Sequence, residues 1–185
     1  MRYIFEITWI IWFLSEVLLT RIFRSKTKVS KGPDRNTLNF LWIAITIAIT
    51  LGVLNSLFFE FPVAGAWINY TGLGLMLAGM LIRFIAIYTL GKFFTVDVSI
   101  HDNHHLVTNG LYRYIRHPAY TGSLMTFTGF GLSMNNWVSL IIVVVPLLLT
   151  FLYRIKVEES TLLGQSGLEY SEYMKHTWRL LPWIY

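Results

Sequence analysis

Two clusters of polar residues stand at the ends of apolar stretches in this 185-residue sequence. The first, GLYRYIRHPAYTG at Gly110–Gly122, places arginine, histidine and tyrosine side chains immediately before an apolar stretch. The second, RIKVEE at Arg154–Glu159, ends the last apolar stretch. Chains that span membranes rarely gather so many polar and aromatic groups at one boundary without a function for them. The two clusters together predict a site between water and lipid.

The first cluster has side chains suited to a ligand that carries both signs of charge. Pro118 disfavours helical backbone at His117 and fits the first turn of a new helix, so a helix is predicted to begin there. The amides of that first turn, together with Arg116, favour an anion or a carboxylate. The faces of Tyr112 and Tyr120 favour a cation.

The second cluster places Arg154 and Glu158 four residues apart, so they share one helix face. Arg154 stands at a predicted membrane boundary, where it can reach a group at headgroup depth. The spacing leaves two interpretations open. One is a functional pair, and the other is a snorkelling arginine with a solvated salt bridge to Glu158.

The spacing of residues argues against several other kinds of site. His101, His104 and His105 are irregularly spaced, and their nearby carboxylates are Asp97 and Asp102, so we predict no metal site. The chain has no cysteine and therefore no disulfide or thiol nucleophile. It also lacks the GxSxG elbow and the glycine patterns of dinucleotide and phosphate loops.

Composition places the chain in a membrane. Its residues are 55% hydrophobic and 14% charged, whereas soluble domains average about 25% charged residues. The net charge is +5, but most lysines and arginines lie at the ends of apolar runs. We therefore expect a lipid bilayer, rather than nucleic acid, as the partner. The length fits a single domain over residues 1–185.

The elements that must position the two clusters are predicted to be membrane helices, each of about 20 apolar residues. The candidate spans are Tyr3–Thr20, Leu38–Phe58, Tyr70–Leu90, the shorter Ala119–Met134, and Trp137–Tyr153. The fold class is therefore all-α, an integral membrane protein with about five transmembrane helices. The first span is interrupted by Glu6 and Glu16, and we interpret it as retained rather than cleaved as a signal.

Basic residues orient these spans. They lie after the first span, after the third span and in the C-terminal tail, which share one side if the chain crosses five times. The positive-inside rule makes that side the cytoplasm. The connection Gly91–Pro118 and an amphipathic helix predicted over Glu158–Thr177 then form a cytoplasmic cap.

Two features lie inside the predicted spans. Arg83 either snorkels to the interface or forms a buried ion pair. Gly74 and Ala78, with Gly72 and Gly79 nearby, predict a face of the third span where another helix approaches closely.

The order of motifs in the C-terminal half resembles a known family. The chain reads TLGKFFT at Thr89–Thr95, HHLVTNGLY at His104–Tyr112, RHPAY at Arg116–Tyr120 and RIKVEE at Arg154–Glu159, and then has Gly167, Tyr170, Tyr173, Arg179 and Pro182. This combination resembles the isoprenylcysteine carboxyl methyltransferases and the related phospholipid N-methyltransferases. The number and length of the spans are similar to the short prokaryotic members, which implies a prokaryotic inner or cell membrane.

The resemblance implies a site for S-adenosylmethionine that faces the cytoplasm, formed by motifs within residues 89–182, with S-adenosylhomocysteine as the product. By position, the cofactor contacts would be Asp97, His104, His105, Leu106, Val107, Tyr112, His117, Pro118, Ala119, Tyr120 and Glu158. Arg154 would meet the methyl acceptor. The chain departs from the family pattern at Ser166, where an aromatic residue commonly stands, and Asp97 occupies a position where relatives vary.

The implied reaction agrees with the residue types. Methyl transfer is an in-line displacement that depends on alignment of the two reactants. Arg116 or the helix amides would take the cofactor carboxylate, and Arg154 would orient a carboxylate acceptor. An amine or thiol acceptor would have to lose a proton, which would involve Glu158, Glu159 or a histidine.

We therefore expect a membrane-embedded methyltransferase that acts on a lipophilic acceptor, with an isoprenylcysteine-like carboxylate as the first choice. The alternatives are a phospholipid N-methyltransferase, a thiol S-methyltransferase, a sterol-reductase-like enzyme and a non-enzymatic membrane scaffold. The sequence leaves the acceptor and the oligomeric state open.

Overall fold

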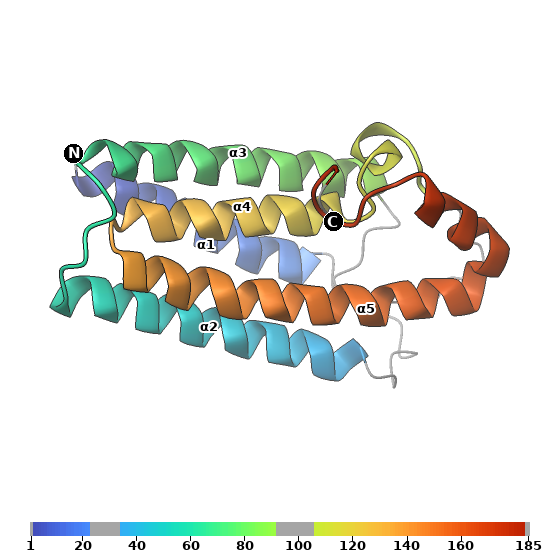
Figure 1. Ribbon diagram of the computed structural model, residues 1–185, viewed down its shortest axis with the longest axis horizontal. Coiled ribbons are helices and arrows are strands. Elements are labelled where there is room, and N and C mark those ends of the chain that lie inside the picture. The colour runs from blue at the N-terminus through green and yellow to red at the C-terminus, as the bar shows by residue number, and fades with distance from the viewer. Residues whose placement is uncertain (1, 23–33, 92–105, 184–185) are drawn as a thin grey trace.

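A computed structural model describes residues 2–22, 34–91 and 106–183, and its elements in these ranges are helices (Figure 1). They are α1 (Arg2–Ile22), α2 (Asp34–Phe58), α3 (Trp67–Leu90), the short 3-10 helix η2 (Gly110–Arg113), α4 (Pro118–Ser133) and α5 (Trp137–Lys175). The prediction of an all-α fold is confirmed.

Three stretches within these helices are long and apolar enough to cross a membrane: Thr37–Phe58, Trp67–Leu90 and Trp137–Gly164. Their outward faces carry large apolar side chains such as Leu57, Phe84 and Leu149, which are 61% exposed or more. Such surfaces belong in lipid. The protein is therefore an integral membrane protein. The count of five spans and the cytoplasmic side of the cap stay predictions.

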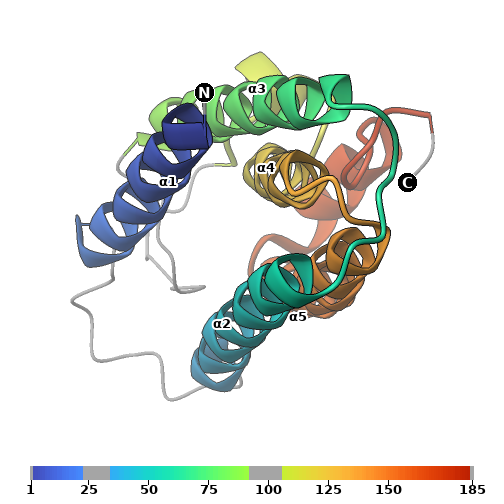
Figure 2. The same ribbon diagram turned by 90° about the vertical axis from the view of Figure 1, so that its left-hand side faces the viewer.

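The helix α4 lies at the centre of the bundle. Figures 1 and 2 show it between α3 and α5, with α1 near α3 and with α2 alongside α5. The buried core draws on all five long helices, with Trp12, Leu41, Met76, Phe127 and Leu147 among its members. The position of α4 matters because this helix begins within the RHPAY motif, at Pro118.

Glycines let α3 and α4 touch along their backbones. A Cβ added at Gly72 would lie 2.7 Å from the carbonyl oxygen of Gly129, and one added at Gly79 would lie 2.6 Å from that of Gly122. Both distances are too short for any real side chain, so the helices are in backbone contact.

The predicted glycine face of the third span was therefore partly wrong. Gly72 and Gly79 are seven residues apart and point the same way, toward α4. Gly74 is rotated about 200° from Gly72, and a Cβ there would meet nothing within 4 Å. Gly74 takes no part in the contact.

The helix α5 is longer than predicted. The sequence suggested a span that ends at Tyr153 and a separate helix over Glu158–Thr177, but α5 continues to Lys175 and changes direction at Gly167. Gly167 has φ 32° and ψ −101°, a conformation that favours glycine. The RIKVEE residues hold no helix breaker, so the helix runs through them and carries Arg154–Glu159 on one rigid rod.

Arg83 forms an ion pair rather than snorkelling alone. Its Nε lies 2.7 Å from Oε1 of Glu16 on α1, and its Nη1 donates to Oγ of Ser123 on α4 over 2.6 Å. Pairing of this kind lowers the cost of an arginine inside a span. The contact joins α1, α3 and α4.

The backbone contact between α3 and α4 predicts the effect of a single methyl group. Gly129→Ala should destabilise the protein by about 1–3 kcal/mol, because the new Cβ overpacks the helix interface. Gly74→Ala is the matched control and should leave stability unchanged or slightly raised, because Ala is the better helix former. Thermal unfolding in detergent measures both, and equal midpoints for the two variants would contradict the assignment of the contact.

Candidate active site at the ends of α4 and α5

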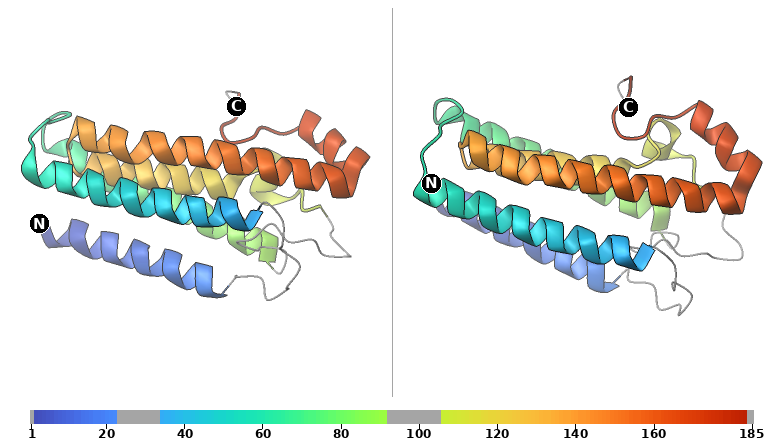
Figure 3. Two further views of the ribbon diagram at one scale, coloured as in Figure 1. Left: turned by 90° about the horizontal axis from the view of Figure 1, so that it is seen from below. Right: turned by 60° about the horizontal axis from the view of Figure 1, so that its bottom comes forward.

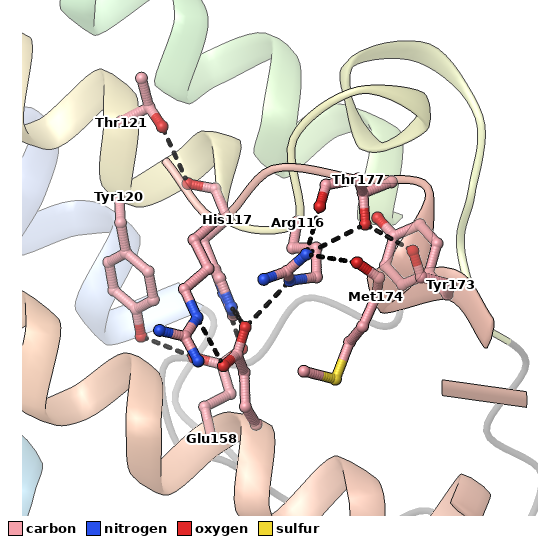
Figure 4. Close-up of polar contacts among 10 residues, drawn as sticks. Arg116, His117, Tyr120, Thr121, Glu158, Tyr173, Met174 and Thr177 are labelled. Carbon is pink, nitrogen blue, oxygen red and sulfur yellow. Dashed lines mark hydrogen bonds and ion pairs between the residues drawn. The ribbon is translucent and has the colours of Figure 1, made fainter. Parts of the chain in front are cut away.

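The two polar clusters of the sequence meet where α4 begins and α5 passes beside it (Figure 4). Tyr120 on the first turn of α4 donates its hydroxyl to Oε2 of Glu158 over 2.9 Å. The same hydroxyl accepts from Nε of Arg154 over 2.8 Å. Tyr120 therefore connects the two charged residues of α5 through one oxygen.

Arg154 is buried, with 2% of its surface exposed. Besides its bond to Tyr120, its Nη1 donates to Oγ1 of Thr37 on α2 over 3.3 Å. A snorkelling arginine with a solvated salt bridge does not fit this burial. Tyr120 lies between Arg154 and Glu158 and bonds to both of them. That the pair is functional stays a prediction.

The start of α4 follows the prediction, with His117 before the helix and Pro118 in its first turn. The amides of Tyr120 and Thr121 both donate to the carbonyl oxygen of His117, over 3.0 and 3.1 Å. These two amides are satisfied within the chain, so they are not available to a bound carboxylate. Of this first turn, the amide of Ala119 is the remaining candidate for such a contact.

Glu159 is the residue that sequence reasoning undervalued. It is 3% exposed and lies between two arginines: Nε of Arg116 donates to its Oε1 and Nε of Arg179 donates to its Oε2, each over 2.9 Å. Nε2 of His117 lies 3.5 Å from Oε1. The sequence carried no local signal for this contact, because Arg116, Glu159 and Arg179 come from three separate segments.

Arg116 is bound by protein groups on the cap. Its Nη1 donates to the carbonyl oxygens of Met174, over 3.1 Å, and Thr177. Next to it, the amides of Arg116 and His117 donate to the carbonyl oxygens of Trp178 and Arg179. The segment before α4 and the segment after α5 therefore run side by side and close the cap.

Tyrosines complete the site on the side of η2. The hydroxyl of Tyr173 donates to the carbonyl oxygen of Tyr112 over 2.6 Å, and burial raises the pKa of Tyr173 to about 12. Burial, followed by the charge of Glu158, raises the pKa of Tyr112 well above its ordinary value. Both hydroxyls therefore stay protonated at neutral pH. The side chain of Tyr112 is close enough to the Glu158 carboxylate to interact with its charge.

The predicted cofactor residues can now be located. His117, Pro118, Ala119, Tyr120 and Glu158 gather where α4 and α5 meet, with Tyr112 beside them on η2. Leu106 and Val107 are partly buried and lead into η2. Asp97, His104 and His105 lie outside the described residues. Thr37 was not predicted as a site residue, and Glu159 was named only as a possible proton acceptor for an amine or thiol substrate.

A membrane-embedded helical bundle with buried arginines and a buried carboxylate at one end is the class of protein that this fold and site define. Residues 72–164 match the model of the isoprenylcysteine carboxyl methyltransferase family, a range that contains α4 and both polar clusters. The chain belongs to the isoprenylcysteine carboxyl methyltransferase family.

Similar proteins cover most of the chain. The probable protein-S-isoprenylcysteine O-methyltransferase of Oryza sativa subsp. japonica is 30% identical over 184 residues, which cover 98% of this chain and 96% of that protein. Protein-S-isoprenylcysteine O-methyltransferase A of Arabidopsis thaliana is 34% identical over 120 residues, covering 64% of this chain and 61% of that protein.

A solved structure shares its fold with most of this chain. The eukaryotic intramembrane Ras methyltransferase of this family superimposes with a TM-score of 0.60 at 26% identity, over 85% of this chain and 55% of that chain. These relatives are eukaryotic, so the expected prokaryotic origin stays a prediction. Family membership makes this chain a membrane methyltransferase and removes support from the sterol-reductase and scaffold alternatives.

The buried carboxylate predicts a stability effect. Glu159→Gln should lower the free energy of unfolding by on the order of 3 kcal/mol, because it leaves Arg116 and Arg179 without their shared negative charge. Glu172→Gln is the matched control on the same helix, where the carboxylate pairs at the surface with Lys175, and it should melt like the parent protein. Thermal unfolding followed by circular dichroism compares the two, and a parent-like midpoint for Glu159→Gln would contradict the role given to Glu159.

Proposed function

We propose that the protein transfers a methyl group from S-adenosylmethionine to the carboxylate of a prenylated cysteine. The observation that carries the proposal is the buried Arg154, bound to Tyr120 at the same site as Glu158. The names of the relatives, which are isoprenylcysteine O-methyltransferases, support this choice of acceptor.

The residues present fit S-adenosylmethionine. Both carboxylate oxygens of Glu159 are engaged by Arg116 and Arg179, whereas the side chain of Glu158 is 27% exposed, so of these two neighbours Glu158 is our choice for a ligand contact. We assign Tyr112 and Tyr120, the tyrosines beside Glu158, to the sulfonium, because aromatic rings attract cations. We assign Glu158 to the polar groups of the cofactor, with His117, Pro118 and Ala119 forming the wall at the start of α4. When bound, S-adenosylmethionine supplies an electrophilic methyl group for an in-line displacement.

Arg154 is assigned to the acceptor. A cysteine carboxylate is ionised at neutral pH, so it needs a cation that orients one oxygen and does not need a general base. The Arg154 guanidinium, held through Nε by Tyr120, offers such a cation beside the cofactor residues. Alignment of acceptor and methyl group is the main demand of this reaction, and a buried, restrained arginine meets it.

Arg116 takes a different role from the one first expected. Its guanidinium contacts Glu159, Met174 and Thr177. We therefore infer that Arg116 is a positioning residue, which holds the start of α4 against the C-terminal segment. The cofactor carboxylate is left to other groups of the cap.

In this proposal the acceptor reaches the site from the bilayer and the cofactor reaches it from the aqueous side. We propose that the site faces the cytoplasm, as the distribution of lysines and arginines indicates. A prenylated acceptor would remain in the bilayer while its carboxylate reaches Arg154 at the helix ends.

The proposal makes a direct prediction about ligand binding. Purified protein should bind S-adenosylhomocysteine in a calorimetric titration, and it should label a prenylated N-acetylcysteine with methyl groups from S-adenosylmethionine. Phosphatidylethanolamine and a small thiol are the comparison acceptors. If the folded protein fails to bind S-adenosylhomocysteine, the assignment of the methyl donor is wrong. If it labels phosphatidylethanolamine or the thiol but not the prenylated cysteine, the assignment of the acceptor is wrong.

The role of Arg154 is tested by its removal. Arg154→Ala should lower kcat/KM for the prenylated cysteine by about 100-fold, because the acceptor carboxylate loses its orienting charge. The affinity for S-adenosylhomocysteine should stay within about threefold of the parent value. Lys156→Ala, two residues along the same helix and exposed, is the matched control with parent-like rates. Full turnover by Arg154→Ala would remove Arg154 from the reaction.

A further inference from the structure

We propose that Thr37, near the start of α2, is a positioning residue that fixes the Arg154 guanidinium for the acceptor carboxylate. The inference rests on the proposed function, because it gives Arg154 a partner in that reaction. Its basis is the hydrogen bond from Nη1 of Arg154 to Oγ1 of Thr37, over 3.3 Å. The two residues are separated by 117 positions in the sequence.

Thr37 belongs to the buried face of α2. It is 4% exposed, and its neighbours Leu38 and Leu41 are 5% and 8% exposed. On the other face, Phe40 and Ile43 are more than half exposed and suit lipid. Figure 3 shows α2 running alongside α5, which is the arrangement that brings Thr37 to Arg154. The hydroxyl of Thr37 is therefore packed against the site.

Two hydroxyls hold different donors of one guanidinium. Tyr120 accepts from Nε over 2.8 Å and Thr37 accepts from Nη1 over 3.3 Å. A guanidinium is planar, so two contacts at separate nitrogens restrict the rotation of the whole group. A restrained arginine loses less conformational freedom when a carboxylate binds, which improves alignment for methyl transfer.

The chemical type of Thr37 suits this task. A neutral hydroxyl orients the guanidinium without the full opposing charge that a carboxylate in the same position would bring. Because α2 ends at Phe58 and the family model begins at residue 72, this contact joins the site to a helix outside the matched range.

The test compares two substitutions of one side chain. Thr37→Val keeps nearly the same shape and removes the acceptor oxygen, whereas Thr37→Ser keeps the oxygen. Thr37→Val should lower kcat/KM for a prenylated N-acetylcysteine by about 10-fold, the effect of one lost hydrogen bond. Thr37→Ser should stay within about twofold of the parent. The KM for S-adenosylmethionine and the affinity for S-adenosylhomocysteine should not change in either variant.

A control and a second background separate positioning from packing. Thr46→Val removes a hydroxyl on the same helix that bonds to its own backbone, at the carbonyl oxygen of Trp42, and should behave like the parent. In an Arg154→Lys background, Thr37→Val should have no further effect on kcat/KM, since lysine has no Nη1 to be held. If Thr37 acted only through packing, Thr37→Val would lower kcat/KM by the same factor in the Arg154→Lys background as in the parent.

Each outcome decides the inference. Parent-like kinetics for Thr37→Val, an equal loss in Thr37→Ser, or a loss confined to the KM for S-adenosylmethionine would overturn it. If Thr37→Val shows no cooperative thermal unfolding, Thr37→Ala replaces it in the comparison with Thr37→Ser. A parent protein that methylates no prenylated cysteine overturns the proposed function and this inference together, whereas an active parent with an unaffected Thr37→Val overturns the inference alone.

Discussion

The site depends on one buried carboxylate, Glu159, held between the guanidinium groups of Arg116 and Arg179. Arg116 precedes α4, Glu159 belongs to α5, and Arg179 follows α5, so this contact ties together the three segments that form the cap. An unpaired charge in such a place would be costly, and the charges therefore require one another. With Glu159 engaged in this way, its neighbour Glu158 is directed toward Tyr120 and is left more exposed.

The helices beneath the cap must associate within lipid, where the hydrophobic effect does not drive helices together. Glycines bring α3 and α4 into backbone contact, and the Arg83–Glu16 pair adds α1. These contacts set the depth and rotation of α4. The first turn of α4 carries Tyr120, which bonds to Arg154 and Glu158, so helix packing within the membrane controls the geometry of the polar site above it.

Local sequence signals predicted a large part of this arrangement. Pro118 marked the start of α4, and the order of motifs indicated the family that residues 72–164 confirm. Local signals failed where geometry at a distance decides. Gly72 and Gly79 face α4 although Gly74 stands between them, because rotation along the helix selects the face. The helix α5 passed its predicted end because no residue near Tyr153 breaks it.

By itself, the sequence determined that the chain is helical, lies in a membrane and carries two polar clusters of a methyltransferase family, since these follow from composition, short spacing and motif order. Only the tertiary structure decided which charges meet. Glu159 differs from Glu158 by one position, yet rotation of about 100° along the helix directs it to Arg116 and Arg179. The contact of Thr37 with Arg154 spans 117 positions and depends on how α2 packs against α5, which no local pattern of residues encodes.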